Sequence, residues 1–166
     1  GLSTDSHTLQ AVYFSNDPNF FTSTSEEITQ VVNKASTKTT LTSSSPTAVF
    51  GQPVTFTAVV SVLAPGAGSP SGTIVFKDGS TVIGTQPVSS STGEQASITV
   101  SNLSVAQHAI SAVYSGDDDF NGSTGNVAQS VIRAQTSTTI ASSANPAASG
   151  QGVQFTATVT PVAPGA

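Results

Sequence analysis

Apolar and polar residues alternate along much of the chain in short stretches that end at turn residues. In the stretch 52–61, Val54, Phe56, Ala58 and Val60 fall on one face of an extended backbone. A period of two is typical of a strand with one buried face. We expect strands in the other short stretches of this kind, which are 37–43, 73–77, 81–88, 95–101, 108–114 and 124–132. With a hairpin signal at Asp78-Gly79 and no helical stretch, the pattern predicts an all-β fold.

The pattern of strands repeats along the chain. The segment KASTKTTLTSSSPTAVFGQPVTFTAVVSVLAPGA from Lys34 aligns without a gap with the segment from Arg133, at an offset of 99 residues and with about half of the positions identical. The stretch LSTDSHTLQAVY from Leu2 likewise matches LSVAQHAISAVY from Leu103. A fixed period of this kind indicates an array of similar structural units.

The repeat accounts for the whole chain. Residues 1–33 correspond to the C-terminal part of one repeat, 34–132 to a complete repeat and 133–166 to the N-terminal part of a third. The two incomplete parts together amount to about two-thirds of a repeat, so they cannot complete one sandwich between neighbouring chains by donor-strand exchange. We expect the chain to be a window onto a longer array.

A unit of about 99 residues has the size of an immunoglobulin-type β-sandwich, and strands at short, regular spacing favour that fold. The sequence predicts tandem immunoglobulin-like β-sandwich repeats. The stretch 129–136 runs from the last strand of one repeat into the first strand of the next with almost no linker. Because a nine-residue strand spans about 30 Å, each repeat is expected to add roughly 30–40 Å to a semi-rigid rod.

Composition narrows the functional classes. Only 8% of the residues are charged, the net charge is −5 with four cations, and serine and threonine make up about a third of the chain. A nucleic-acid partner is not expected, because neutralising phosphates requires a basic patch. No apolar run reaches the roughly 18 residues of a membrane span, so membrane insertion is not expected. The absence of cysteine excludes disulfides and the usual zinc sites.

Several motifs resemble a known family. TTLTSS, GQPVTFTA, APGAG, PSGTIVFKDGST and LSVAQHAISAVYSGDDDF are similar to the bacterial Ig-like repeats of large surface and secreted proteins, and the resemblance covers the whole chain. It implies an extracellular or cell-surface location and a spacer role in adhesin-like proteins. It brings no catalytic residues, so we expect no enzyme activity. Residues 16–21 depart from the loop of the complete repeat without disturbing the apolar pattern.

Two histidines and two tyrosines recur in successive repeats. His7 and His108 lie just before the strands that end in Tyr13 and Tyr114. A catalytic residue has no reason to recur in every spacer, whereas a structural residue must. We predict that the histidines bond a neighbouring loop and fix the corner, much as a tyrosine corner does in other sandwiches, and that the tyrosines are structural too.

Asp117, Asp118 and Asp119 form the densest acidic cluster. Calcium takes six to eight oxygen ligands and could stiffen a rod between repeats. Aspartates also occupy such loops because their side chains cap the backbone, and three consecutive carboxylates cannot all converge on one ion. The turn interpretation is favoured, calcium stays open, and no other cofactor is expected.

The chain also contains residues that suggest N-glycosylation and serine-based catalysis. Asn102-Leu103-Ser104 and Asn121-Gly122-Ser123 fit the N-glycosylation sequon, although chance could produce both in a chain this rich in serine and asparagine. A serine nucleophile would need a histidine base and an orienting carboxylate, and no G-x-S-x-G turn occurs.

Three functions compete. The first is a non-catalytic stalk whose partners are the neighbouring repeats of the same chain. The second is a segment of a self-assembling extracellular filament, which would need an exposed strand edge or apolar patch. The third is a carbohydrate-binding module, which is disfavoured because the chain has no tryptophan.

Overall fold

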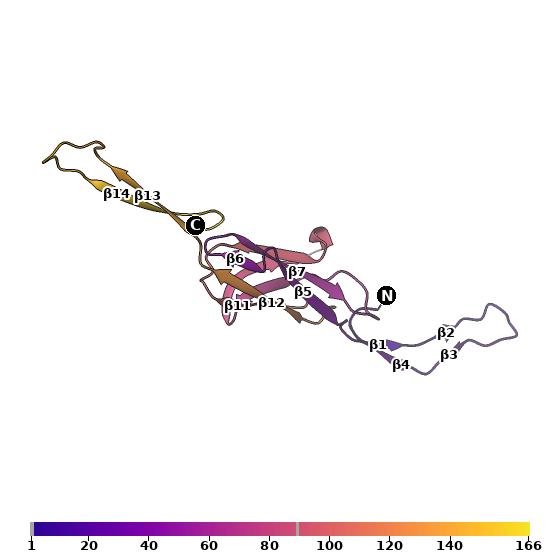
Figure 1. Cartoon of the computed structure of the whole chain (residues 1–166). Coiled ribbons are helices and arrows are strands. Elements are labelled where there is room, and N and C mark those ends of the chain that lie inside the picture. The colour runs from indigo at the N-terminus through magenta and orange to yellow at the C-terminus, as the bar shows by residue number, and fades with distance from the viewer. Residues whose placement is uncertain (1, 89) are drawn as a thin grey trace.

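A computed structural model describes residues 2–88 and 90–166. Residues 34–132 form two sheets packed face to face (Figure 1). The three-stranded sheet has the order β10-β7-β5, and the five-stranded sheet has the order β6-β12-β11-β8-β9. The strands of the first sheet are β5 (Thr37–Ser43), β7 (Val54–Val62) and β10 (Gln95–Val100). Those of the second are β6 (Thr47–Val49), β8 (Thr73–Asp78), β9 (Thr81–Pro87), β11 (Gln107–Tyr114) and β12 (Ser123–Ile132).

The seven strands predicted from the alternating pattern are all present, with ends shifted by no more than two residues. The prediction of an all-β, immunoglobulin-like sandwich is therefore confirmed. The β8–β9 hairpin turns at Gly79, whose φ of 56° lies in the left-handed region that glycine enters without a steric penalty. The short 3-10 turn η1 (Ser90–Thr92) precedes β10.

The sequence pattern missed one strand. β6 has only three residues, too few for an alternation to be visible, and it follows Pro46 in a stretch that resembles a turn. It pairs in parallel with β12, with Thr47 opposite Ser130 and Val49 opposite Ile132, whereas the other strands of the two sheets pair antiparallel. The chain thus crosses from one sheet to the other between β5 and β6.

The core lies between the two sheets of residues 34–132. Strand β7 alternates between buried and partly exposed residues, so that Val54, Phe56, Ala58 and Val60 point inward. On the opposing sheet, β11 buries every second residue from His108 to Tyr114. Every apolar side chain that is buried in the described part of the chain belongs to this sandwich. These are Leu41, Ala48, Val54, Phe56, Ala58, Val60, Pro70, Ile74, Phe76, Val88, Ala96, Ile98, Ile110, Ala112, Tyr114, Phe120 and Val131. Residues 34–132 therefore contain a complete core, and the segment has the size of a domain that folds by itself.

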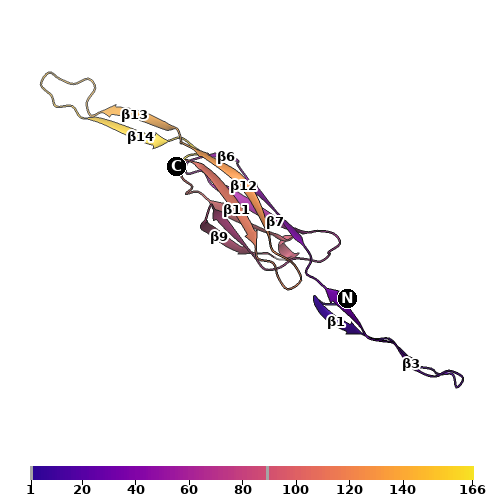
Figure 2. The same ribbon diagram turned by 90° about the horizontal axis from the view of Figure 1, so that it is seen from below.

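Hairpins extend from opposite ends of the sandwich (Figures 1 and 2). The N-terminal hairpin pairs β1 (Asp5–Leu9) with β4 (Ile28–Val32) and, further out, β2 (Val12–Tyr13) with β3 (Ser23–Thr24). The C-terminal hairpin pairs β13 (Thr136–Ser142) with β14 (Phe155–Pro161).

Each hairpin has the register of its equivalent in the sandwich. β13 and β14 pair Thr136 with Pro161, and β5 and β7 pair Thr37 with Val62, which is the same register at an offset of 99. His7 lies opposite Gln30 as His108 lies opposite Gln129. The division of the chain at residues 33 and 132 stays a prediction.

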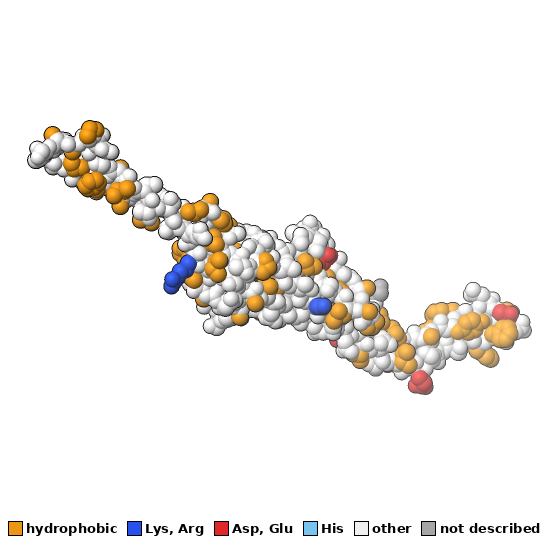
Figure 3. Space-filling model, in the orientation of Figure 1, with side chains coloured by type: hydrophobic (Ala, Val, Ile, Leu, Met, Phe, Trp, Pro, Cys, Tyr) orange, Lys and Arg blue, Asp and Glu red, His pale blue; other side chains and the backbone are white. Residues whose placement is uncertain are grey.

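The surface is polar with little charge. In the face shown in Figure 3, lysine and arginine occur as isolated spots, and most of the surface is uncharged. Apolar side chains gather on the two hairpins, where exposed residues include Phe20, Phe21, Ile140, Phe155 and Val159. None of the described residues forms a helix long and apolar enough to cross a membrane.

Candidate functional site

His108 connects the start of β11 to the end of β8. Its Nδ1 lies 2.7 Å from Oδ2 of Asp78, and its Nε2 lies 2.9 Å from the backbone oxygen of Ser104. Both partners are acceptors when Asp78 is ionised, so the protonated ring, which donates from both nitrogens, fits this site best. The Ser104 carbonyl raises the pKa of His108, burial opposes this, and the Asp78 carboxylate raises it further. The net effect is a pKa above the ordinary 6.5.

His7 repeats half of this arrangement. Its Nε2 lies 2.7 Å from the backbone oxygen of Ser3, four residues earlier, as Nε2 of His108 does from that of Ser104. The N-terminal hairpin has no counterpart of Asp78 among its described residues, because no strand equivalent to β8 accompanies it. The bond between the histidine and the backbone four residues earlier is therefore present in both copies. The bond to the aspartate on β8 forms only in the complete sandwich.

The tyrosines differ more than the histidines. Tyr114 is almost fully buried, whereas Tyr13 is half-exposed on its isolated hairpin. The Tyr114 hydroxyl is buried without a hydrogen-bond partner among the described residues. Burial raises its pKa to about 12, with a further contribution from the nearby charge of Asp117. Tyr114 thus acts in the core through its ring, and its hydroxyl does not form the bond that defines a tyrosine corner.

Asp117 shapes the turn between β11 and β12. Its Oδ2 accepts hydrogen bonds of 2.7 Å from both the backbone nitrogen and the hydroxyl of Ser71. Its Oδ1 accepts from the backbone nitrogens of Asp119 and Phe120 at 3.0 and 2.9 Å. Burial works to raise the pKa of Asp117, but these hydrogen bonds outweigh burial and lower it below its ordinary value. Both oxygens are engaged in holding the loop.

The other two aspartates make different contacts from those of Asp117. Asp118 is exposed, and Oδ1 of Asp119 accepts a 2.6 Å hydrogen bond from the hydroxyl of Thr4 in the N-terminal hairpin. No group of three His, Cys, Asp or Glu side chains arranged to hold a metal ion occurs within residues 2–88 and 90–166. The hydrogen bonds of Asp117 agree with the turn interpretation of this acidic loop, and calcium binding at Asp117, Asp118 and Asp119 stays a prediction.

The two sequons lie on the surface. Asn102 and Asn121 are both exposed. The Asn121 side chain donates from Nδ2 to the backbone oxygen of Lys34 at 3.2 Å, and its backbone nitrogen donates to Ala35. Asn121 thus fixes the strand that enters the sandwich, so a glycan on its Nδ2 would disturb that contact. Glycosylation at either site stays a prediction.

Gln129 is a structural residue that the sequence reasoning did not single out. Its side chain is fully buried, its Oε1 accepts a 2.6 Å bond from the hydroxyl of Ser43, and its Nε2 donates to the backbone oxygens of Ser45 and Ser130. These bonds connect β12 to the crossing between β5 and β6. The signal that could have found it is the recurrence of glutamine at the same repeat position, Gln30. A polar residue that recurs within an apolar strand suggests a buried group with satisfied hydrogen-bond partners.

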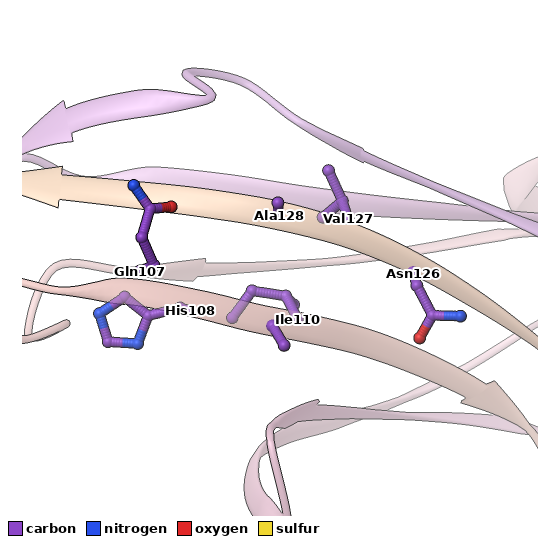
Figure 4. Close-up of a pocket in the computed structure, with 7 residues that line it drawn as sticks. Gln107, His108, Ile110, Asn126, Val127 and Ala128 are labelled. Carbon is purple, nitrogen blue, oxygen red and sulfur yellow. The ribbon is translucent and has the colours of Figure 1, made fainter.

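A shallow groove of about 420 Å³ runs along β11 and β12 beside His108 (Figure 4). Its lining is largely apolar and comprises Gln107, His108, Ala109, Ile110, Asn126, Val127 and Ala128. None of these lining residues is a nucleophile or a carboxylate, and both ring nitrogens of His108 already have partners. A histidine bonded in this way cannot accept a proton from a nucleophile, so the groove lacks the arrangement that catalysis by a triad requires.

Comparison with known proteins places the sandwich in a family. The model of the bacterial Ig-like domain (group 3) matches residues 41–132, which span β5 to β12 and more than half of the chain. Comparison with curated proteins finds no significant match. Domains of the matching family are generally non-catalytic and typically extracellular, which agrees with a structural role at a surface. The chain belongs to the bacterial Ig-like domain family.

Proposed function

We propose that this chain is a segment of a non-catalytic stalk, in which Ig-like repeats placed end to end act as spacers in a large extracellular, adhesin-like protein. The observation that carries the proposal is the way in which the repeats are joined. Strand β4 ends at Val32 and β5 begins at Thr37, and β12 ends at Ile132 and β13 begins at Thr136. The joins are therefore four and three residues long, which is at the short end of connections in compact proteins.

The joins are also bonded to the sandwich. Ala35 donates from its backbone nitrogen to Asp119 at 2.8 Å, and its oxygen accepts from Asn121 at 2.9 Å. At the other end, the backbone nitrogen of Phe50 donates a 2.8 Å hydrogen bond to the oxygen of Ile132, the last residue of β12, so the strand is held in place up to the point where the second join begins. A join whose backbone is hydrogen-bonded in this way does not act as a flexible linker. Figures 1 and 2 show the hairpins leaving the sandwich in opposite directions, as expected for a rod.

One edge of the five-stranded sheet has features that favour a spacer over a filament. Strand β9, at the edge of the five-stranded sheet, carries an irregularity where Phe76 pairs with Gly84 and Lys77 pairs with Val82. The strand ends at Pro87, which has no backbone N–H to donate. Bulges and prolines at edges are the features by which native sheets avoid pairing with other chains.

The test is small-angle scattering with mass determination on residues 34–132 and on a chain of three such repeats, each with and without calcium. A monomeric rod that lengthens by about 30–40 Å per repeat is expected. Concentration-dependent growth into fibres would refute the passive spacer and favour the filament. A compact three-repeat particle would refute the rod.

A further inference from the structure

The C-terminal hairpin rests on a loop at one end of the sandwich. The backbone nitrogen of Ala166 donates 3.2 Å to the oxygen of Phe50. The next residue, Gly51, has a φ of 85°, and a Cβ placed on it would lie within 2.8 Å of Ala166. The equivalent glycine on the hairpin, Gly150, has a φ of 84° and open space around it. The loop that follows β14, which contains Gly165 and Ala166, is therefore in direct contact with the Phe50-Gly51 loop.

The N-terminal hairpin meets the opposite end of the sandwich through different residues. The hydroxyl of Thr4 bonds the Asp119 carboxylate at 2.6 Å. Between the two parts lies a cavity of about 610 Å³. Its walls come from residues 2–4 and 32–33 on one side and from residues 66–69 and 119–120 on the other.

The repeat relates these two junctions. At an offset of 99, Gly165 and Ala166 correspond to Gly66 and Ala67, which line the cavity at the N-terminal junction. The loop also packs in the same way in both copies, because a Cβ on Gly66 would meet Ala35 and one on Gly165 would meet Ala134. In the same alignment, Leu2, Ser3 and Thr4 correspond to residues 103–105 of the complete repeat. Each junction thus contains part of the contact that two complete repeats would make. The C-terminal junction shows the contact of the 49–51 loop, and the N-terminal junction shows the contact of the segment equivalent to 103–105.

We propose that successive complete repeats dock through one composite end-to-end interface. The loop 64–69 and the turn 117–120 of one repeat bind the loop 49–51 and the loop 103–105 of the repeat before it. The cavity at the N-terminal junction is then the seat of the Phe50-Gly51 loop of a preceding complete repeat. This inference rests on the proposed stalk function and specifies how the stalk is stiffened.

The exposed side chains at the docking end fit this occupant. Phe50, Val105 and Ile132 are each a little under half exposed. The opposing loop consists of small residues, Gly66, Ala67, Gly68 and Ser69, which allow close approach of the backbone. Docking of the next complete repeat would reduce the exposed apolar area of these side chains, and the small residues of the opposing loop would allow the close approach that this requires.

The test uses a chain with two copies of residues 34–132, since these residues hold a complete core. The protein has no cysteine, so Ser97→Cys in each copy gives two defined, exposed positions for spin labels, and pulsed electron paramagnetic resonance gives the distribution of distances between them. A narrow distribution is expected for the parent chain. Gly51→Ala in the first copy, whose loop lies at the junction, is expected to broaden it.

The matched control is the same Gly51→Ala change in the second copy, where the loop lies at the free end. The backbone cost of alanine at positive φ is the same in both copies, so a difference between them reports on the junction alone. Phe50→Ala in the first and then the second copy repeats the comparison without backbone strain and serves if the glycine variants do not fold. Broadening in the first copy only supports the proposal.

Two outcomes would overturn it. One is a broad distribution in the parent chain, and the other is equal behaviour of first-copy and second-copy variants in both pairs. Either result would leave the stalk itself standing if scattering still showed a monomer that lengthens with each repeat. Growth into fibres in scattering would instead refute the stalk.

Discussion

Phe56 and Phe155 occupy the same position in two copies of the repeat, but their surroundings differ. Phe56 on β7 is 0% exposed inside the sandwich, and Phe155 on β14 is 66% exposed on the C-terminal hairpin. Replacing a buried phenylalanine by alanine costs about 3–5 kcal/mol through lost transfer free energy and the cavity that remains. An exposed substitution usually changes stability by less than about 0.5 kcal/mol. We therefore expect Phe56→Ala to destabilise the protein strongly and Phe155→Ala to leave the sandwich unchanged.

The assay is equilibrium unfolding of the full chain in urea. If the free energy of unfolding falls by about 1.5 kcal/mol per molar urea, the Phe56→Ala midpoint should drop by about 2–3 M. That loss is a large share of the roughly 5–15 kcal/mol of a typical domain, so Val60→Ala and Val159→Ala form a milder pair with the same contrast in burial. Equal shifts within either pair would refute the conclusion that residues 34–132 are the cooperative unit.

Four further predictions concern the polar groups. In urea titrations, the parent chain should be more stable than His108→Gln at pH 6, and this difference should shrink when the pH is raised to 8. The raised pKa of His108 gives a stabilisation that is present below pH 6.5 and is lost as the pH rises through the folded pKa. A difference that stays constant with pH would contradict this. Asp117→Asn should lower the free energy of unfolding by about 1–3 kcal/mol at pH 7. This loss should disappear in acid, as the pH falls from 3.8 through the lowered pKa of Asp117, and a pH series of urea titrations measures it. Tyr114→Phe should be neutral or stabilising by about 1 kcal/mol in thermal unfolding, since its hydroxyl is buried without a partner, and a loss above about 2 kcal/mol would reveal a missing partner. Calcium or a chelator should leave the melting temperature unchanged, because the oxygens of Asp117 are already bonded; a rise with calcium would support the metal interpretation instead.

Much of the fold could be read from local pattern. Alternation in β7 and the Asp78-Gly79 turn depend on neighbouring residues only, because strand periodicity and turn geometry are properties of short segments. Strand β6 was not predicted, because a stretch of three residues is too short to show an alternation of apolar and polar positions. The interpretation of the Asp117 turn followed from the chemistry of aspartate in loops, whereas the missing hydroxyl partner of Tyr114 depends on a core that no local pattern describes.

The sequence by itself determined seven strands of the sandwich, the repeat and the family resemblance, since each is encoded in residues close together or in the comparison of one segment with another. Only the tertiary structure decided which strands share a sheet, that β6 pairs in parallel with β12, and that Gln129 is buried with satisfied partners. The contrast between Phe56 and Phe155 gives the physical reason. Both residues lie in similar local sequences, QPVTFTAVV and QGVQFTATV, and in the same hairpin register. Burial is conferred by strands distant in the chain, which cover one of them and not the other.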